Sequence, residues 1–222
     1  KTLLDDNITV LFCGTPCQCI GLKAYLQKRY ENLIIVDLLC TCVNPQYLLK
    51  EHVKNITGEF YNNIKVNFRD KITGWGGNPQ GGEFSFSLEW EDNNGKQYKF
   101  YDYLYDDDFF KGFLSHIWMK DSCEKCSYSS SERVSDFTLG DFWNIGLKEE
   151  YKELNDNRGL SFVKINTNKA KKIFAELHDR LKIKKIVDYD WALTTQCAIN
   201  GKAYQKHKNT DKFFEYAPRH YS

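Results

Sequence analysis

Long apolar runs are missing from this chain of 222 residues, and neither sign of charge is in excess. No run approaches the roughly 20 apolar residues that a membrane-spanning helix needs, so we expect no membrane span. The 31 basic residues nearly balance the 30 acidic ones, which leaves a net charge of +1. Such a balance creates no strong field, and we therefore expect no binding to nucleic acid or to a membrane surface.

Several signatures of enzymes and of modular proteins are missing as well. The chain has no repeats, no low-complexity tract and no Pro-rich linker, so residues 1–222 are expected to form a single domain. It has no Walker-type phosphate loop and no Ser/His/Asp arrangement. The glycine-dense residues 74–82 lack the strand and helix context of a dinucleotide site. They predict either a flexible hairpin loop or a loop in which a planar ring stacks on Trp75.

Cysteine, in contrast, is abundant. The chain has eight cysteines and begins at Lys1 without a visible signal peptide or an initiator Met. This combination favours a reducing compartment, so we expect a cytoplasmic location, in a piece of a longer protein. The cysteines are then expected to be ligands, catalytic thiols or buried small side chains. A secreted, disulfide-bonded protein is the alternative.

The pattern of apolar residues predicts an α/β fold. Residues 8–12 and 33–39 are short apolar runs typical of buried strands, and apolar residues recur at helical spacing between about 17 and 29. A strand–helix–strand order implies a parallel pair with a right-handed crossover. An antiparallel hairpin region is inserted, because strands at 84–90 and 98–100 flank the turn signal of residues 93–95. Further strands are predicted at 64–68, 136–139 and 160–165, and helices at 45–56, 107–118, 168–181 and from 190 onward.

Thiols follow the predicted strands. Cys13, Cys17 and Cys40 would lie at the carboxyl edge of the parallel pair, where open α/β sheets bind ligands. Cys17 lies in the first turn of the predicted helix, where the helix dipole favours an anion. Cys123 and Cys126 form a Cys-x-x-Cys loop, which can bind a metal or a cluster.

Four thiolates suffice for either an iron–sulfur cubane or a tetrahedral zinc. Cys13 and Cys42 are alternative ligands, and Cys197 is expected to be a core residue. The role of Cys19 stays open, with core packing as one interpretation. A third hypothesis is a dithiol oxidoreductase that uses Cys13 and Cys17, although a thioredoxin-type loop has only two intervening residues.

Four separated motifs carry a family resemblance. The chain resembles the coenzyme F-420 hydrogenase/dehydrogenase beta-subunit family, C-terminal domain. The motifs that carry the resemblance are residues 11–18 (LFCGTPCQ), 36–40 (VDLLC), 68–75 and 122–143. The resemblance covers roughly residues 8 to 146. One departure is that the family usually continues the second motif as Cys-His-Gly, where this chain has Cys40-Thr41-Cys42. Family members also carry sequence upstream, often a ferredoxin-like domain, which this piece lacks.

The resemblance implies an oxidoreductase module that transfers electrons between a [4Fe-4S] cluster, a flavin and an unknown acceptor or donor. FAD is expected ahead of FMN. A ferredoxin-like domain or protein would be the electron partner, and a small molecule the substrate. The implied cluster ligands are Cys17, Cys40, Cys123 and Cys126. The implied flavin-binding residues are Arg69, Lys71, Gly140, Asp141 and Trp143. The alternative function is a zinc-stabilised structural module associated with surface-polysaccharide biosynthesis.

Overall fold

A computed structural model describes residues 1–59, 61, 63–75, 84–182, 184–199 and 204–216. The chain divides into two compact units, each assembled from three separate segments. Unit 1 comprises Lys1–Thr41, Cys126–Asn144 and Leu160–Ala203, and unit 2 comprises Cys42–Lys125, Ile145–Gly159 and Tyr204–Ser222. The predicted α/β class is confirmed, because helices accompany a largely parallel sheet in unit 1 and an antiparallel sheet in unit 2. The single domain over residues 1–222 stays a prediction.

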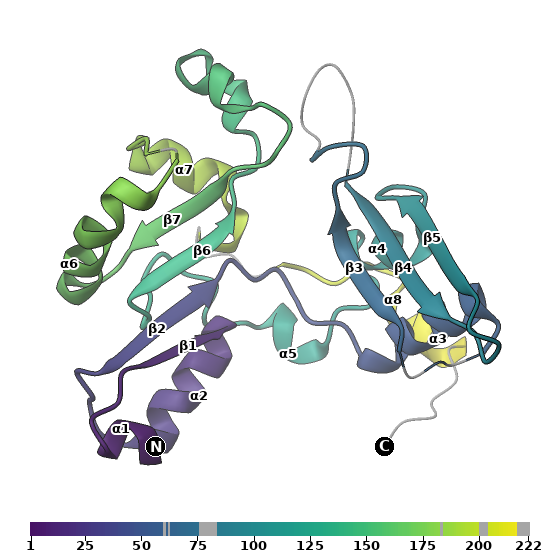
Figure 1. The fold of residues 1–222 in the computed structure, drawn as a ribbon, viewed down its shortest axis with the longest axis horizontal. Coiled ribbons are helices and arrows are strands. Elements are labelled where there is room, and N and C mark those ends of the chain that lie inside the picture. The colour runs from purple at the N-terminus through teal and green to yellow at the C-terminus, as the bar shows by residue number, and fades with distance from the viewer. Residues whose placement is uncertain (60, 62, 76–83, 183, 200–203, 217–222) are drawn as a thin grey trace. The chain divides into compact units, whose positions relative to one another are not determined.

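Unit 1 contains a four-stranded sheet in the order β1-β2-β6-β7 (Figure 1). The strands are β1 (Val10–Gly14), β2 (Leu33–Leu38), β6 (Phe137–Asp141) and β7 (Ser161–Ile165). β1 pairs with β2 in parallel, as predicted, and β2 pairs with β6 in parallel, whereas β7 runs antiparallel to β6. The carboxyl ends of three strands therefore meet at one edge of the sheet.

Helices cover both faces of this sheet. From α2 (Pro16–Leu26), Cys19 and Leu26 pack against Leu33 and Ile35, together with Leu4 of α1 (Thr2–Asp5). From α6 (Asn168–Leu177), the residues Ala170, Ile173 and Phe174 pack against Ile34, Val36 and Phe137. Because successive strand residues point to opposite faces, α2 and α6 lie on opposite sides of β2.

Asp136 joins α6 to the sheet. Its carboxylate accepts hydrogen bonds from the Ile35 amide at 2.9 Å and from the Thr167 hydroxyl at 2.7 Å, and it lies 3.1 Å from Lys169 Nζ. Burial raises the pKa of Asp136, but these partners outweigh burial and hold the pKa below its ordinary value. Thr167 in turn caps α6, because its hydroxyl accepts from the Ala170 amide.

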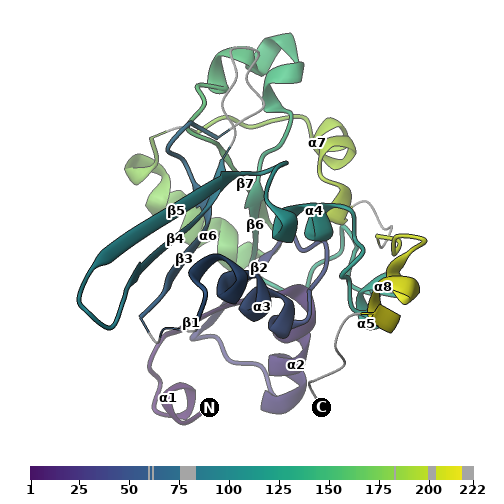
Figure 2. The same cartoon turned by 90° about the vertical axis from the view of Figure 1, so that its right-hand side faces the viewer.

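Unit 2 contains a three-stranded antiparallel sheet in the order β3-β4-β5 (Figure 2). Its strands are β3 (Lys65–Asp70), β4 (Ser85–Glu91) and β5 (Gln97–Tyr103). The predicted hairpin is confirmed, because β4 and β5 pair and Gly95 turns the chain with a φ of 80°. Rings from α3 (Gln46–Thr57) and α4 (Asp108–Leu114) pack against Phe86 of β4.

The remaining elements are short. They are α5 (Asp121–Glu124), α7 (Tyr189–Thr195), α8 (Thr210–Tyr216) and the 3₁₀ helices η1 (Ile145–Leu147), η2 (Glu149–Leu154), η3 (His178–Arg180) and η4 (Cys197–Ile199). The sequence predicts one helical tail from residue 190, and the structure breaks it into separate short helices. The predicted helix 168–181 is α-helical only to Leu177 and continues as η3. Within the described residues, none of the helices has the length and apolar character needed to cross a membrane.

The helix predicted over 107–118 is too long, because α4 ends at Leu114. His116 adopts a φ of 59°, so the chain reverses there. Trp118 then lies so close to α4 that a Cβ on Gly112 would come within 2.3 Å of the indole. A tertiary contact, rather than local sequence preference, thus ends the helix.

Asp107 offers a test of the packing in unit 2. Its fully buried carboxylate accepts from the Phe110 amide at 2.8 Å, which caps α4, and lies 2.8 Å from His52 Nε2. We expect Asp107→Ala to lower the free energy of unfolding by about 2–4 kcal/mol, because it removes the cap and leaves the half-buried His52 imidazole without its partner.

The measurement is urea denaturation followed by circular dichroism. Asp107→Asn is the matched control, because its amide oxygen can still accept from the Phe110 amide. It should lose less stability than Asp107→Ala. Equal losses for the two variants would contradict this account.

Candidate functional site

The first thiol of the candidate site lies where β1 passes into α2. Pro16 is the first residue of α2, and Cys17 follows it in the first turn, as predicted. The Thr15 amide donates to Gln18 Oε1 at 2.9 Å, and the Thr15 hydroxyl lies 3.1 Å from Cys17 Sγ. Cys17 is exposed and free. The structure thus presents this thiol at a helix N-terminus, a position that favours an anion.

Arg133 lies among further cysteines of unit 1. Its side chain is only 2% exposed, and its Nη1 lies 3.7 Å from Asp37 Oδ2. Burial lowers the pKa of Arg133, and nearby acidic groups oppose that shift. In decreasing order of effect, these groups are Asp37, Cys126, Cys40 and Cys19. Two of the predicted ligands, Cys40 and Cys126, therefore share the surroundings of one buried cation.

Cys19 is a core residue, which agrees with one of the interpretations left open by the sequence. It is fully buried, and its thiol lies 3.8 Å from the carbonyl oxygens of Gly14 and Val36. Burial, with Asp37 nearby, raises the pKa of Cys19 to about 11. Cys13 is exposed and Cys42 is buried. The side chain of Cys197 lies outside the described residues.

The four predicted cluster ligands are divided between the units. Cys17, Cys40 and Cys126 belong to unit 1, whereas Cys123, in α5, belongs to unit 2. No disulfide joins any of the seven described cysteines. Among the described residues, no three His, Cys, Asp or Glu side chains gather closely enough to hold one metal ion.

Four thiolates can bind either an iron–sulfur cluster or a single zinc, and the two groups require different spacings of the sulfurs. The four sulfurs around one zinc lie about 3.8 Å apart, because each Zn–S bond is roughly 2.3 Å long in a tetrahedron. A cubane binds each thiolate through a different iron, so its ligands stand farther apart. The ligand set and the identity of the bound group stay predictions.

The charged groups of Arg69 and Lys71 lie over aromatic rings of unit 2. The guanidinium of Arg69 lies 4.1 Å from the ring centre of Phe84, and Lys71 Nζ lies 4.8 Å from that of Trp75. Lys71 also donates to the Arg158 carbonyl at 2.6 Å. Trp75 is only 7% exposed and its ring contacts Phe84, so it presents no open surface for a stacked ligand. Residues 76–83 of the predicted glycine loop lie outside the described residues.

Gly140, Asp141 and Trp143, the other predicted flavin residues, follow one another at the end of β6 in unit 1. A Cβ on Gly140 would come within 2.4 Å of the Leu39 side chain, so close packing accounts for this glycine. The predicted flavin residues therefore come from both units, and the flavin assignment stays a prediction.

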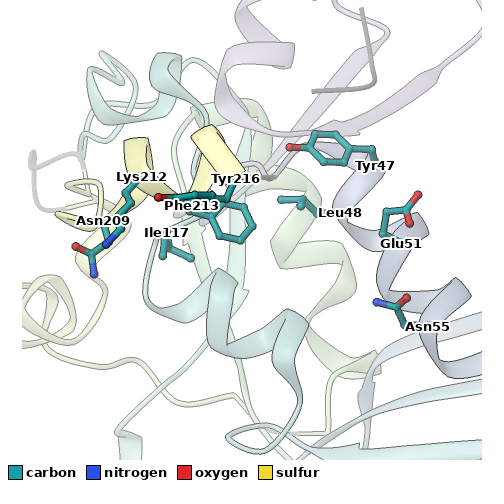
Figure 3. A pocket seen from close by; sticks show the side chains of 9 residues that line it. All are labelled: Tyr47, Leu48, Glu51, Asn55, Ile117, Asn209, Lys212, Phe213 and Tyr216. Carbon is teal, nitrogen blue, oxygen red and sulfur yellow. The ribbon is translucent and has the colours of Figure 1, made fainter. Parts of the chain in front are cut away.

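A separate cavity lies within unit 2, with a volume of about 610 Å³. Figure 3 shows aromatic side chains of α8 facing α3 across this space. Its lining consists of Tyr47, Leu48, Glu51, Asn55, Ile117, Asn209, Lys212, Phe213 and Tyr216. Burial raises the pKa of Tyr47. None of these nine residues is among the predicted site residues.

Sequence reasoning also missed the role of Asp37, and it included Arg133 only as part of a motif. One signal was available, since Asp37 is the single charged residue in the apolar run of residues 33–39. A charge in a buried strand requires a partner.

The chain belongs to a redox family. Residues 8–188 match the family model that describes the C terminus of the beta subunit of coenzyme F420 hydrogenase/dehydrogenase. The family resemblance drawn from the four motifs is therefore confirmed, and the family is one of hydrogenase or dehydrogenase subunits. Comparison with curated proteins gives no significant match, and neither does comparison with solved structures.

Alkylation of the metal-free, reduced protein tests the assignment of the thiols. With iodoacetamide at about pH 8, near the ordinary pKa of a thiol, we expect exposed Cys13 and Cys17 to react first and Cys19 to stay unmodified until the protein is unfolded, because it is fully buried. Mass spectrometry of the peptides gives the rates, and a sample in urea is the control. Reaction of Cys19 at the rate of Cys17 would refute its place in the core.

Proposed function

We propose that this chain is the iron–sulfur and flavin module of an oxidoreductase, transferring electrons between a [4Fe-4S] cluster, a flavin and a further acceptor or donor. The observation that carries the proposal is the grouping of unit 1: Cys40 and Cys126 beside buried Arg133, in a chain of a redox family. Cys17, at the start of α2, is exposed and available as a further ligand of the same kind.

Each proposed ligand has a distinct local support. Cys17 stands at a helix N-terminus, Cys40 follows β2 at the carboxyl edge of the sheet, and Cys126 follows α5. Cys123, in α5, is the proposed fourth ligand. Thiolates suit iron–sulfur clusters because they are soft, polarisable donors. When bound, the cluster would accept and pass on single electrons.

The proposed flavin site is supported by the charge and residue types of the predicted flavin-binding residues. Arg69 and Lys71 supply positive charge for a cofactor phosphate or a reduced, anionic flavin. Gly140 and Asp141 end β6, and Trp143 follows two residues later. FAD is proposed ahead of FMN. We also propose a ferredoxin-like electron partner, a small-molecule substrate and a cytoplasmic location.

The proposal is tested by anaerobic purification of the full-length protein, with absorption spectroscopy and analysis of iron, sulfide, zinc and flavin. We expect about four irons per chain, with absorption at the blue–violet edge and a flavin released on denaturation. A colourless protein with one zinc and no flavin would overturn the proposal in favour of a zinc-stabilised structural module.

Substitution of single cysteines identifies the ligands. We expect Cys126→Ala and Cys123→Ala to lose most of the iron and to be less stable than the wild type, because ligand binding is coupled to folding. Cys13→Ala is the matched control and should keep its iron. Activity that depends on Cys13 and Cys17, with Cys123 and Cys126 dispensable, would instead support the dithiol oxidoreductase.

A further inference from the structure

Asp37 is a buried carboxylate with incomplete pairing. It lies near the end of β2 and is fully buried, and neither of its oxygens accepts a hydrogen bond within the described part of the chain. Arg133 Nη1 is 3.7 Å away, beyond hydrogen-bonding distance. Burying a charge with so little compensation is costly, so this residue requires an explanation.

Backbone carbonyl groups hold the Arg133 side chain in place, but not all of its hydrogen-bond donors are paired. Its guanidinium donates to the carbonyl oxygens of Tyr128 at 3.3 Å and Ala198 at 3.0 Å, which fixes its position. Its buried Nε has no hydrogen-bond partner among the described residues. The cation is therefore anchored by backbone groups, and its charge remains available to a neighbouring anion.

A second cation, Lys164, lies near Asp37 and Arg133. Lys164 is held by the Ser131 carbonyl at 2.9 Å and by Asn166 Oδ1 at 2.6 Å. Burial lowers the pKa of Lys164, the charge of Arg133 lowers it further, and Asp37 opposes them. Two cations, buried Arg133 and half-buried Lys164, thus lie near one carboxylate, so positive charge is in excess here.

Two of the proposed cluster ligands, Cys40 and Cys126, lie close enough to Arg133 to act on its charge. Cys40 follows Asp37 by three residues at the carboxyl edge of the sheet, and Tyr128, which accepts from Arg133, follows Cys126 by two. A cubane with four thiolate ligands carries net negative charge, and reduction adds one further electron. The excess positive charge is thus placed where a bound cluster would need it.

We propose that Arg133 and Asp37 are positioning residues that set the reduction potential of the cluster in opposite directions. The inference rests on the proposed function. The charge of Arg133 stabilises the reduced, more negative cluster and raises its potential, whereas the charge of Asp37 destabilises that state and lowers the potential.

The experiment is a redox titration of the anaerobically purified full-length protein, followed by electron paramagnetic resonance of the reduced cluster. Asp37→Asn should shift the midpoint potential upward, and Arg133→Gln should shift it downward. Arg133→Lys keeps the charge and should remain closer to the wild type than Arg133→Gln does. The double variant should lie between the two single variants, because the lost charges cancel.

Lys28→Gln is the control for a remote charge, because Lys28 lies on the exposed surface of unit 1, paired with Asp5. Its shift sets the scale for an unspecific effect. Shifts of the same sign for Asp37→Asn and Arg133→Gln, or shifts no larger than that of Lys28→Gln, would overturn the inference.

The design also covers a variant that does not fold. If Arg133→Gln cannot be purified with iron, the comparison of Asp37→Asn with the wild type decides, and an unchanged or lower potential refutes the inference. A wild-type protein without iron would refute the proposed function, and the inference with it. If the wild-type protein holds a cluster but neither Asp37→Asn nor Arg133→Gln changes its midpoint potential, the inference is refuted and the proposed function is not.

Discussion

The parallel pairing of β1, β2 and β6 is the constraint on which the candidate site depends. Parallel strands have their carboxyl ends at one edge, so the segments after Gly14, Leu38 and Asp141 start from the same side of the sheet. With α2 and α6 packed on opposite faces of β2, that edge is left for loops. The positions of Cys17 and Cys40 follow from this arrangement, whereas Cys126 belongs to the Cys-x-x-Cys loop after α5.

Local patterns were enough to predict much of this fold. The strand–helix–strand unit and the hairpin depend on periodicity and turn chemistry within short windows, and both are present. The predicted helix over 107–118 failed because Trp118 packs back on Gly112. The antiparallel place of β7 beside β6 was likewise not predicted, since strand order is set by contacts between distant segments.

The candidate site was predictable only where it depends on local sequence. The position of Cys17 at a helix start follows from local sequence, and the structure confirms it, whereas the role of Cys19 was left open and its burial is seen only in the structure. The Asp37–Arg133 pair joins segments far apart in the chain, so only the lone charge in an apolar run hinted at it. Division of the predicted cofactor residues between two units was also invisible to motif spacing.

The alternation of the two units along the chain has a consequence for synthesis on the ribosome. The strands β3, β4 and β5 lie within one continuous segment, so the whole antiparallel sheet can form while the chain is still growing. The four-stranded sheet of unit 1 is complete only once β7 and α6 are made, because both come from the segment Leu160–Ala203. Until then Ile34 and Val36 lack their helix, and β6 is an open edge. The nascent protein therefore completes the inserted sheet first and the thiol-bearing one later.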